Sequence, residues 1–137
     1  MQRVLGRYTE YVYAILRIVV GLLFVLHATQ KFFSYPPMPK GMPPMEHLPT
    51  MLAVAGTIEL VCGLLIMFGF FASVAAFIAS GEMAVAYFMG HFPGGFWPHT
   101  NNGEPAVLFC FVFLYIAAKG SGLLSIDGLI GRSAVQA

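Results

Sequence analysis

Residues 11–33, YVYAILRIVVGLLFVLHATQKFF, are apolar almost throughout, yet the stretch contains Arg17 and ends with His27, Gln30 and Lys31. At about 1.5 Å of rise per residue, it is long enough to cross the roughly 30 Å hydrocarbon core of a bilayer as one helix. The internal arginine and the absence of a small-residue cleavage site argue against a removed secretion signal. We therefore predict a retained membrane-spanning helix.

The composition of the whole chain agrees with this interpretation. Of 137 residues, 58% are hydrophobic and 9% are charged, and the mean hydropathy is +0.79. Soluble domains carry about 25% charged residues, so this chain has too little polar surface for water and belongs in a membrane. Its length predicts a single domain over residues 1–137. The net charge of +1 argues against nucleic acid as a partner, because such binding needs a basic face.

Three more apolar stretches follow, separated by segments rich in proline and glycine. We expect spans at about 11–33, 50–70, 74–92 and 106–118, with outer loops at 34–49 and 93–105. The predicted fold is therefore all-α, an integral membrane four-helix antiparallel bundle. Lysine and arginine near the spans favour the cytoplasmic side. The basic residues at the termini outnumber those near the first loop, which predicts that both termini are cytoplasmic: Arg3, Arg7, Lys119 and Arg132 against Lys31 and Lys40.

Helical spacing places the polar residues of the spans on faces that also carry small residues. Small residues let membrane helices approach closely, so these faces are expected to contact other helices and not lipid. The three faces are Arg17, Gly21, Phe24, His27, Ala28 and Lys31 on the first span; Gly56, Glu59 and Gly63 on the second; and Ala72, Ala75, Ala79, Glu82, Ala86 and Gly90 on the third.

The two acidic residues of these faces lie at similar depth. Glu59 and Glu82 are each roughly 15 Å from the inner boundary, and the long side chain of Arg17 is expected to reach toward them. An isolated charge at that depth costs about 3 kcal/mol or more. Two carboxylates and one guanidinium leave an excess negative charge, so one carboxyl is expected to hold a proton. We predict that Arg17, His27, Glu59 and Glu82 form a catalytic, proton-handling cluster.

Each of these residues also has a structural explanation. A pair between Arg17 and Glu59 would fix the register of two helices. His27 fits a buried core histidine, and Lys31 fits a side chain that extends to the lipid headgroups. Cys62 and Cys110 both lie in apolar runs, so they are expected to be small packing residues and not a disulfide.

Five segments in sequence order resemble the DoxX family, a family of small bacterial four-helix membrane proteins. The segments are LRIVVGLLFVLHATQKFF (16–33), GTIELVCGLLIMFGFFA (56–72), AVAYFMGHFPGGF (84–96), NGEPAVLF (102–109) and GSGLLSID (120–127), and together they extend over nearly the whole chain. The resemblance implies a multi-pass protein of the bacterial inner membrane. The residues that match the family pattern are Arg17, His27, Gln30, Lys31, Glu59, His91, Glu104 and Asp127.

The resemblance also implies a redox-associated function, because the family is named for a membrane component linked to thiosulfate oxidation with quinone as the acceptor. We therefore expect the chain to bind quinone or to handle its protons together with a partner oxidoreductase. His27, Lys31 and His91 are the expected cofactor-binding residues. The alternative is a non-catalytic accessory subunit that anchors a larger membrane complex. Besides membrane lipid, a larger complex or a homo-oligomer is the expected partner.

The first loop offers one further hypothesis. Methionine and histidine side chains are soft ligands that suit Cu(I). Methionine is also an ordinary interfacial residue between prolines, so we predict no metal site. The side chains concerned are Met38, Met42, Met45, His47 and Met51.

Overall fold

The computed structural model describes residues 1–37 and 48–131, and this part of the chain is helical without any strand. The long helices are α2 (Thr9–Phe33), α3 (Thr50–Phe68), α4 (Ala72–Ala86) and α5 (Glu104–Lys119). Short elements extend them: α1 (Gln2–Leu5) and η1 (Gly6–Tyr8) precede α2, and η2 (Tyr87–His91) and η3 (Phe92–Gly94) follow α4. The last element is α6 (Ile126–Leu129). The all-α prediction is confirmed.

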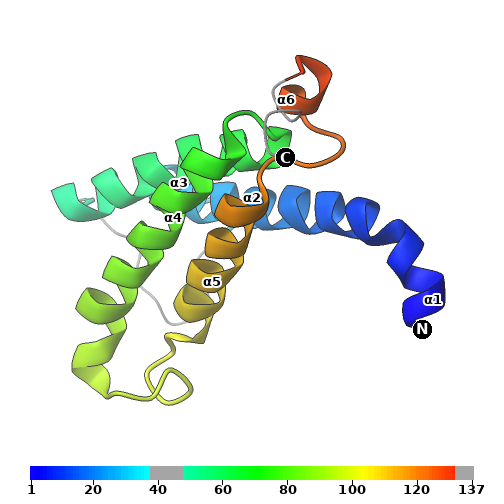
Figure 1. The fold of residues 1–137 in the computed structure, drawn as a ribbon. Coiled ribbons are helices and arrows are strands. Elements are labelled where there is room, and N and C mark those ends of the chain that lie inside the picture. The colour runs from blue at the N-terminus through cyan, green and yellow to red at the C-terminus, as the bar shows by residue number, and fades with distance from the viewer. Residues whose placement is uncertain (38–47, 132–137) are drawn as a thin grey trace.

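Three helical stretches are long and apolar enough to cross a membrane, namely Gln2–Phe33, Thr50–Phe68 and Ala72–Gly94. In the sequence they correspond to the first three predicted spans. The fourth predicted span corresponds to α5, which is shorter, with 16 residues. Antiparallel pairing holds within two hairpins, α2 with α3 and α4 with α5, but Figure 1 shows the second hairpin crossing the first obliquely. A four-helix antiparallel bundle is therefore not confirmed.

The α2–α3 contact depends on two glycines. A Cβ atom on Gly21 would lie 2.7 Å from the backbone nitrogen of Met67, and one on Gly63 would lie 3.0 Å from the carbonyl oxygen of Gly21. No larger residue fits at this closest approach. The contact confirms that the small residues of both helices face each other, as the helical spacing predicts.

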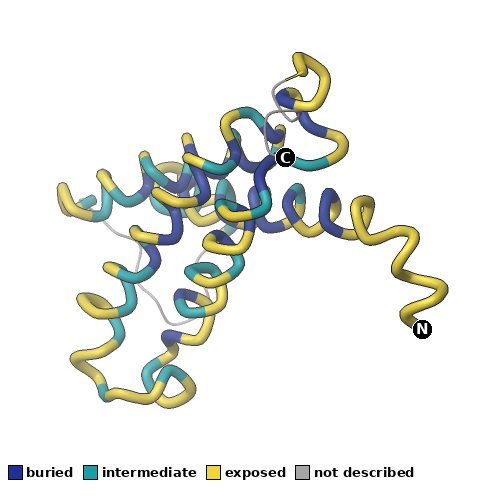
Figure 2. The backbone as a smooth tube through the Cα atoms, in the orientation of Figure 1, coloured by how far each residue is buried: buried dark blue, intermediate teal, exposed yellow. Residues whose placement is uncertain are grey.

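Alanines and two serines, Ser73 and Ser80, form the contact between α4 and α5. The α4 face with Ala72, Ala75, Ala76 and Ala79 is buried (Figure 2). On the same helix, the Ser80 hydroxyl donates a hydrogen bond to the carbonyl oxygen of Cys110 at 2.8 Å. In a membrane such hydrogen bonds between helices add to the close packing of small residues.

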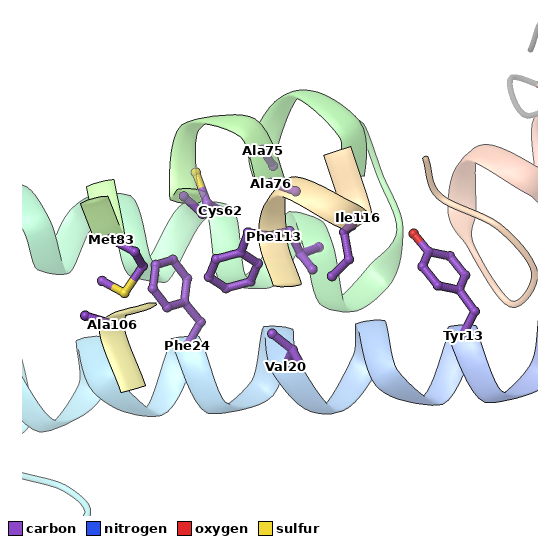
Figure 3. Close-up of a cluster of buried hydrophobic side chains, with 12 residues drawn as sticks. Tyr13, Val20, Phe24, Cys62, Ala75, Ala76, Met83, Ala106, Phe113 and Ile116 are labelled. Carbon is purple, nitrogen blue, oxygen red and sulfur yellow. The ribbon is translucent and has the colours of Figure 1, made fainter. Parts of the chain in front are cut away.

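Aromatic rings fill the centre, where the two hairpins cross. The rings of Phe24 on α2 and Phe113 on α5 lie edge to face at 4.6 Å, and both side chains are fully buried (Figure 3). Cys62 lies beside them, buried and free of a disulfide. This aromatic centre separates two ends of the molecule. The loop end is where α2 and α4 end and α3 and α5 begin, and the tail end holds the α3–α4 turn and residues 120–131.

Candidate functional site

An ion pair joins α2 to α3 near the loop end. Lys31 Nζ donates to Oε1 of Glu59, and the two side chains are 19% and 3% exposed. Gly56, one turn before Glu59, lets the neighbouring Phe32 ring approach α3, because a Cβ there would lie 2.9 Å from Cε2 of Phe32. The lysine therefore does not extend toward headgroups, as one sequence-based explanation held. It turns inward, since a buried carboxylate needs a cation.

Glu82 on α4 lies within electrostatic range of this ion pair. Its residue is partly exposed, but its Oε2 atom is buried and has no hydrogen-bond partner among residues 1–37 and 48–131. The second oxygen of Glu59, Oε2, is likewise buried without a partner in the described chain. The structure thus brings Lys31, Glu59 and Glu82 together. Lys31 is paired with Glu59, and Glu82 is a second carboxyl within electrostatic range of that cation.

Glu82 also lines an apolar cleft of about 530 Å³ between α3 and α4. The cleft lies in the half of these helices nearer the loop end, with His91 at its margin. Its lining is almost entirely aliphatic, and the residues are Met51, Leu52, Val54, Ala55, Ile58, Ile78, Glu82, Val85, Ala86, Met89, Gly90 and His91. The carboxyl group of Glu82 and the imidazole of His91 are therefore the ionisable groups in a cleft with otherwise apolar walls.

A π-helical turn positions His91. The turn Tyr87–His91 widens the end of the third predicted span, and such turns recur at functional sites. Nδ1 of His91 lies 3.1 Å from the carbonyl oxygen of Asn101, and a carbonyl only accepts, so Nδ1 carries the hydrogen. In the neutral ring Nε2 is then the acceptor. Asn101 is itself held by a 2.7 Å hydrogen bond to the carbonyl oxygen of Gly95.

His27 lies outside the cleft. The residue is exposed on α2, and its ring packs edge to face on Phe109 of α5, with centroids 5.7 Å apart. This corrects the expectation that His27 faces the interior. The reason is register: Ala28, the next residue, occupies the buried face, which leaves His27 at its edge. His27 remains within electrostatic range of Glu59 and Lys31.

Arg17 is not part of the carboxyl cluster, and the expected reach toward Glu59 and Glu82 is corrected. Its fully buried guanidinium lies at the tail end, about 21 Å along α2 from Lys31. Nη1 donates to the carbonyl oxygens of Ile66 (2.6 Å) and Met67 (2.8 Å) at the end of α3. Nη2 donates to those of Leu123 (3.2 Å) and Leu124 (2.8 Å) in the tail.

Arg17 binds these carbonyls because helix ends leave carbonyl groups without helical partners. The turn beside the guanidinium requires glycine: Gly69 has φ +65°, and a Cβ there would lie 2.8 Å from Nη1 of Arg17. The structure therefore agrees better with a role for Arg17 in holding the fold together than with a role in carrying protons. Its partners are backbone groups, however, and not Glu59.

The polar contacts of the tail, residues 120–131, were not among the features predicted from the sequence. Ser121 donates to Oδ2 of Asp127 at 2.6 Å, and the backbone nitrogen of Asp127 donates to the carbonyl oxygen of Gly69 at 3.0 Å. Ser125 caps α6 by accepting from the nitrogen of Gly128 at 3.0 Å. The segment GSGLLSID, residues 120–127, carried the signal, since its small and polar residues differ from those of an ordinary interfacial tail.

The described residues contain no group of three or more histidine, cysteine, aspartate or glutamate side chains placed to hold a metal ion. The proposed copper ligands Met38, Met42, Met45 and His47 lie outside the described residues, as do Lys40 and Arg132, which entered the orientation argument. Gln30 at the end of α2 donates to the carbonyl oxygens of Pro36 (3.2 Å) and Pro37 (3.3 Å). It thus organises the start of the loop.

Comparison with known proteins gives one family match and one similar protein. A sequence model described as DoxX matches residues 12–92. A Haemophilus influenzae (strain ATCC 51907 / DSM 11121 / KW20 / Rd) protein described as uncharacterized is 44% identical over 126 residues, which cover 90% of this chain and 93% of that protein. No solved structure matches significantly. The family match and the apolar helices establish membrane-protein character, and the chain belongs to the DoxX family.

Proposed function

We propose that this protein is a redox-associated membrane protein that binds a quinone or quinone-like lipid between α3 and α4 and exchanges a proton with it through Glu82. One observation carries the proposal. An apolar cleft contains a carboxyl group whose buried Oε2 atom has no hydrogen-bond partner in the described part of the chain. A polar atom in such a place favours a ligand that is mostly apolar but presents its own hydrogen-bonding oxygen.

The dimensions and lining of the cleft fit a quinone ring. Small-molecule sites span about 300–1,000 Å³ and combine apolar walls with a few polar groups. This cleft has about 530 Å³, aliphatic walls, and Glu82 and His91 as its ionisable groups. Ile78 and Val85 line it and are also about half exposed, so the isoprenoid tail would leave toward lipid along α4.

The proposed chemistry divides between the ligand and the chain. A bound quinone supplies a two-electron, two-proton couple. Glu82 would donate a hydrogen bond to a ring oxygen or accept one from it, according to its protonation, and would transfer a proton along that bond. Nε2 of His91 offers a second hydrogen-bonding atom at the loop end of the cleft. A partner oxidoreductase supplies or removes the electrons.

The proposal includes an orientation. With both termini in the cytoplasm of a bacterial inner membrane, the cleft and the Lys31–Glu59 pair face the outer half of the bilayer. The exposed rings of Phe96 and Trp97 then lie at the outer headgroup level, where aromatic residues collect. Quinone would enter sideways from the outer leaflet.

Fluorescence of Trp97, the single tryptophan, provides a direct test. The protein in lipid nanodiscs is titrated with decylubiquinone, a short-tailed quinone that quenches tryptophan. We expect saturable quenching in the wild type and binding weakened about 5–30-fold in Glu82→Gln, as for loss of a hydrogen bond worth roughly 1–2 kcal/mol. Glu10→Gln, at the opposite end of the molecule, is the matched control. Quenching that rises linearly and is identical in all three proteins contradicts the proposal.

The alternative function is a non-catalytic subunit that anchors a larger enzyme. Arg17 favours it, because a buried charge bound to four backbone carbonyls stabilises the fold without needing a substrate. Native mass spectrometry of the protein extracted from its own membrane separates the two functions. A large protein partner with phospholipid alone, unchanged in Glu82→Gln, supports the anchor. Bound quinone that is lost in Glu82→Gln supports the redox function.

A further inference from the structure

We propose that Glu59 and Glu82 hold one proton between them and that Lys31 balances the charge of whichever carboxyl is ionised. The two carboxyls would then form a relay from the cleft toward the loop end. Its use for quinone rests on the proposed function, but its existence does not, because the relay is built from the chain's own side chains. The transfer breaks an O–H bond on one carboxyl and forms one on the other, and no electron moves.

The first argument is the hydrogen bonding of the carboxyl oxygens. Oε1 of Glu59 accepts from Lys31, whereas its Oε2 is buried and has no donor among the described residues. Oε2 of Glu82 is in the same situation on the facing helix. An ionised carboxyl only accepts hydrogen bonds, but a protonated one also donates. Lys31 is the donor that the structure gives these two carboxyls, and a proton on one of them would add a second donor to the site.

The second argument is the balance of charge. The titratable groups of this region come from every helix packed around it: His27 and Lys31 from α2, Glu59 and Cys62 from α3, Glu82 from α4 and His91 from η2. With Lys31 charged and the imidazoles and thiol neutral, two carboxylates would leave a net charge of −1. A bound proton removes that net charge.

The third argument is the order of exposure. Glu82 lines the cleft, the Glu59 side chain is 3% exposed, and that of Lys31 is 19% exposed near the end of α2. The three groups thus lead from a lipid-facing cleft, through a buried carboxyl, to a cation at the loop end. Glu59 is the positioning and transfer residue in the middle.

Infrared spectroscopy of the quinone-free protein tests this arrangement. The C=O stretch of a protonated carboxyl is recorded at neutral pH in nanodiscs, with isotopically labelled glutamate to separate it from aspartate. We expect one such band in the wild type. It should disappear in Glu82→Gln, because Glu59 then pairs with Lys31, and also in Glu59→Gln, because Lys31 then pairs with Glu82. Lys31→Met should about double it, and Lys31→Arg and Glu104→Gln should leave it unchanged.

The outcomes separate this inference from quinone binding. A band that persists in Glu59→Gln, or no band in the wild type, overturns the shared proton. If the band follows the expected pattern but quinone does not bind, the relay stands and the proposed function fails. If quinone binding depends on Glu82 while the band is insensitive to Glu59, Glu82 acts alone. Size-exclusion profiles confirm that each variant is folded, and Lys31→Arg keeps the charge test usable if Lys31→Met is not.

Discussion

Gly21 of α2 lies against Gly63 of α3 so closely that a Cβ atom on Gly21 would be 2.9 Å from the carbonyl oxygen of Gly63. The obstructing atoms belong to backbone, which cannot rotate away as a side chain does. Helices that touch in this way gain dispersion contacts along their whole length, which matters in lipid because burial of apolar surface gives little there. The two glycines therefore fix the spacing of the first hairpin, and with it the reach from Lys31 to Glu59.

Gly21→Ala is expected to destabilise the protein by about 1–3 kcal/mol, the usual cost of overfilling a packed interface. Gly81→Ala is the matched control, because a Cβ on Gly81 meets nothing within 4 Å. The control should be neutral or slightly stabilising, since alanine favours helix. Thermal unfolding in detergent, followed by circular dichroism, measures both. Equal melting temperatures for the two variants would contradict the backbone contact.

Lys31→Met is expected to destabilise by about 3–5 kcal/mol near neutral pH, because Glu59 loses its cation and can stay buried only by taking up a proton, which is unfavourable at that pH. Adding Glu59→Gln to this variant should recover most of the loss. The exposed pair of Lys119 and Glu10, with Nζ 2.8 Å from Oε1, is the control. Surface pairs contribute about 0–1 kcal/mol, so Lys119→Met should have little effect. Denaturation of the wild type, Lys31→Met, Glu59→Gln and the double variant gives the coupling energy, and a coupling near zero for Lys31 and Glu59 would refute the buried pair.

Arg17→Lys keeps the charge but is expected to cost about 2 kcal/mol or more, because one ammonium group cannot reach four carbonyls that two guanidinium nitrogens now bind. Residues 120–131 should then detach from the end of α3. Limited proteolysis detects this as faster cleavage within the tail. Arg3→Lys, at an exposed position, should be cut at the wild-type rate. A tail that stays protected in Arg17→Lys would show that the other tail contacts suffice.

Ser121→Ala is expected to cost about 1.5–3 kcal/mol, the usual contribution of a hydrogen bond to a charged group. The variant removes the 2.6 Å bond to Asp127 and leaves the helices untouched. Hydrogen exchange should therefore rise in residues 120–131 and stay unchanged in α2 and α3. Thr100→Ala removes an exposed hydroxyl bond in the other loop and serves as the control. Faster exchange throughout the chain would instead indicate a global effect.

The helices and their buried faces could be predicted from the sequence, because both depend on the spacing of apolar and small residues within a short segment of the chain. Gly21, Gly63 and the alanines of α4 all lie where their spacing places them. The partners of the charges were not predictable in the same way. Depth along a straight helix put Arg17 near Glu59, but the side chain turned toward free carbonyls at the helix end. For Lys31 the sequence leaves open both a cofactor-binding position and an extension to the headgroups, because its long side chain can turn either way.

The cleft was also beyond sequence reasoning. It depends on the oblique crossing of the two hairpins and on the π-helical turn at Tyr87–His91. The spacing of apolar residues in the sequence predicts neither feature. Glu82 and His91 were identified as candidates, but their common cleft was not. His27 shows the opposite error, since one step of helical register moved it from the interior to the surface beside Phe109.

The bonds of Arg17 have a consequence for the order of assembly in the membrane. The ribosome makes Arg17 more than one hundred residues before Leu123 and Leu124, which accept two of its four hydrogen bonds. The first span must therefore enter the bilayer while its guanidinium is only partly bonded, at an energetic cost of a few kcal/mol. Residues 120–131, which are made after all four long helices, complete the bonding. The first long helix therefore obtains its full set of hydrogen bonds only after synthesis of the other three.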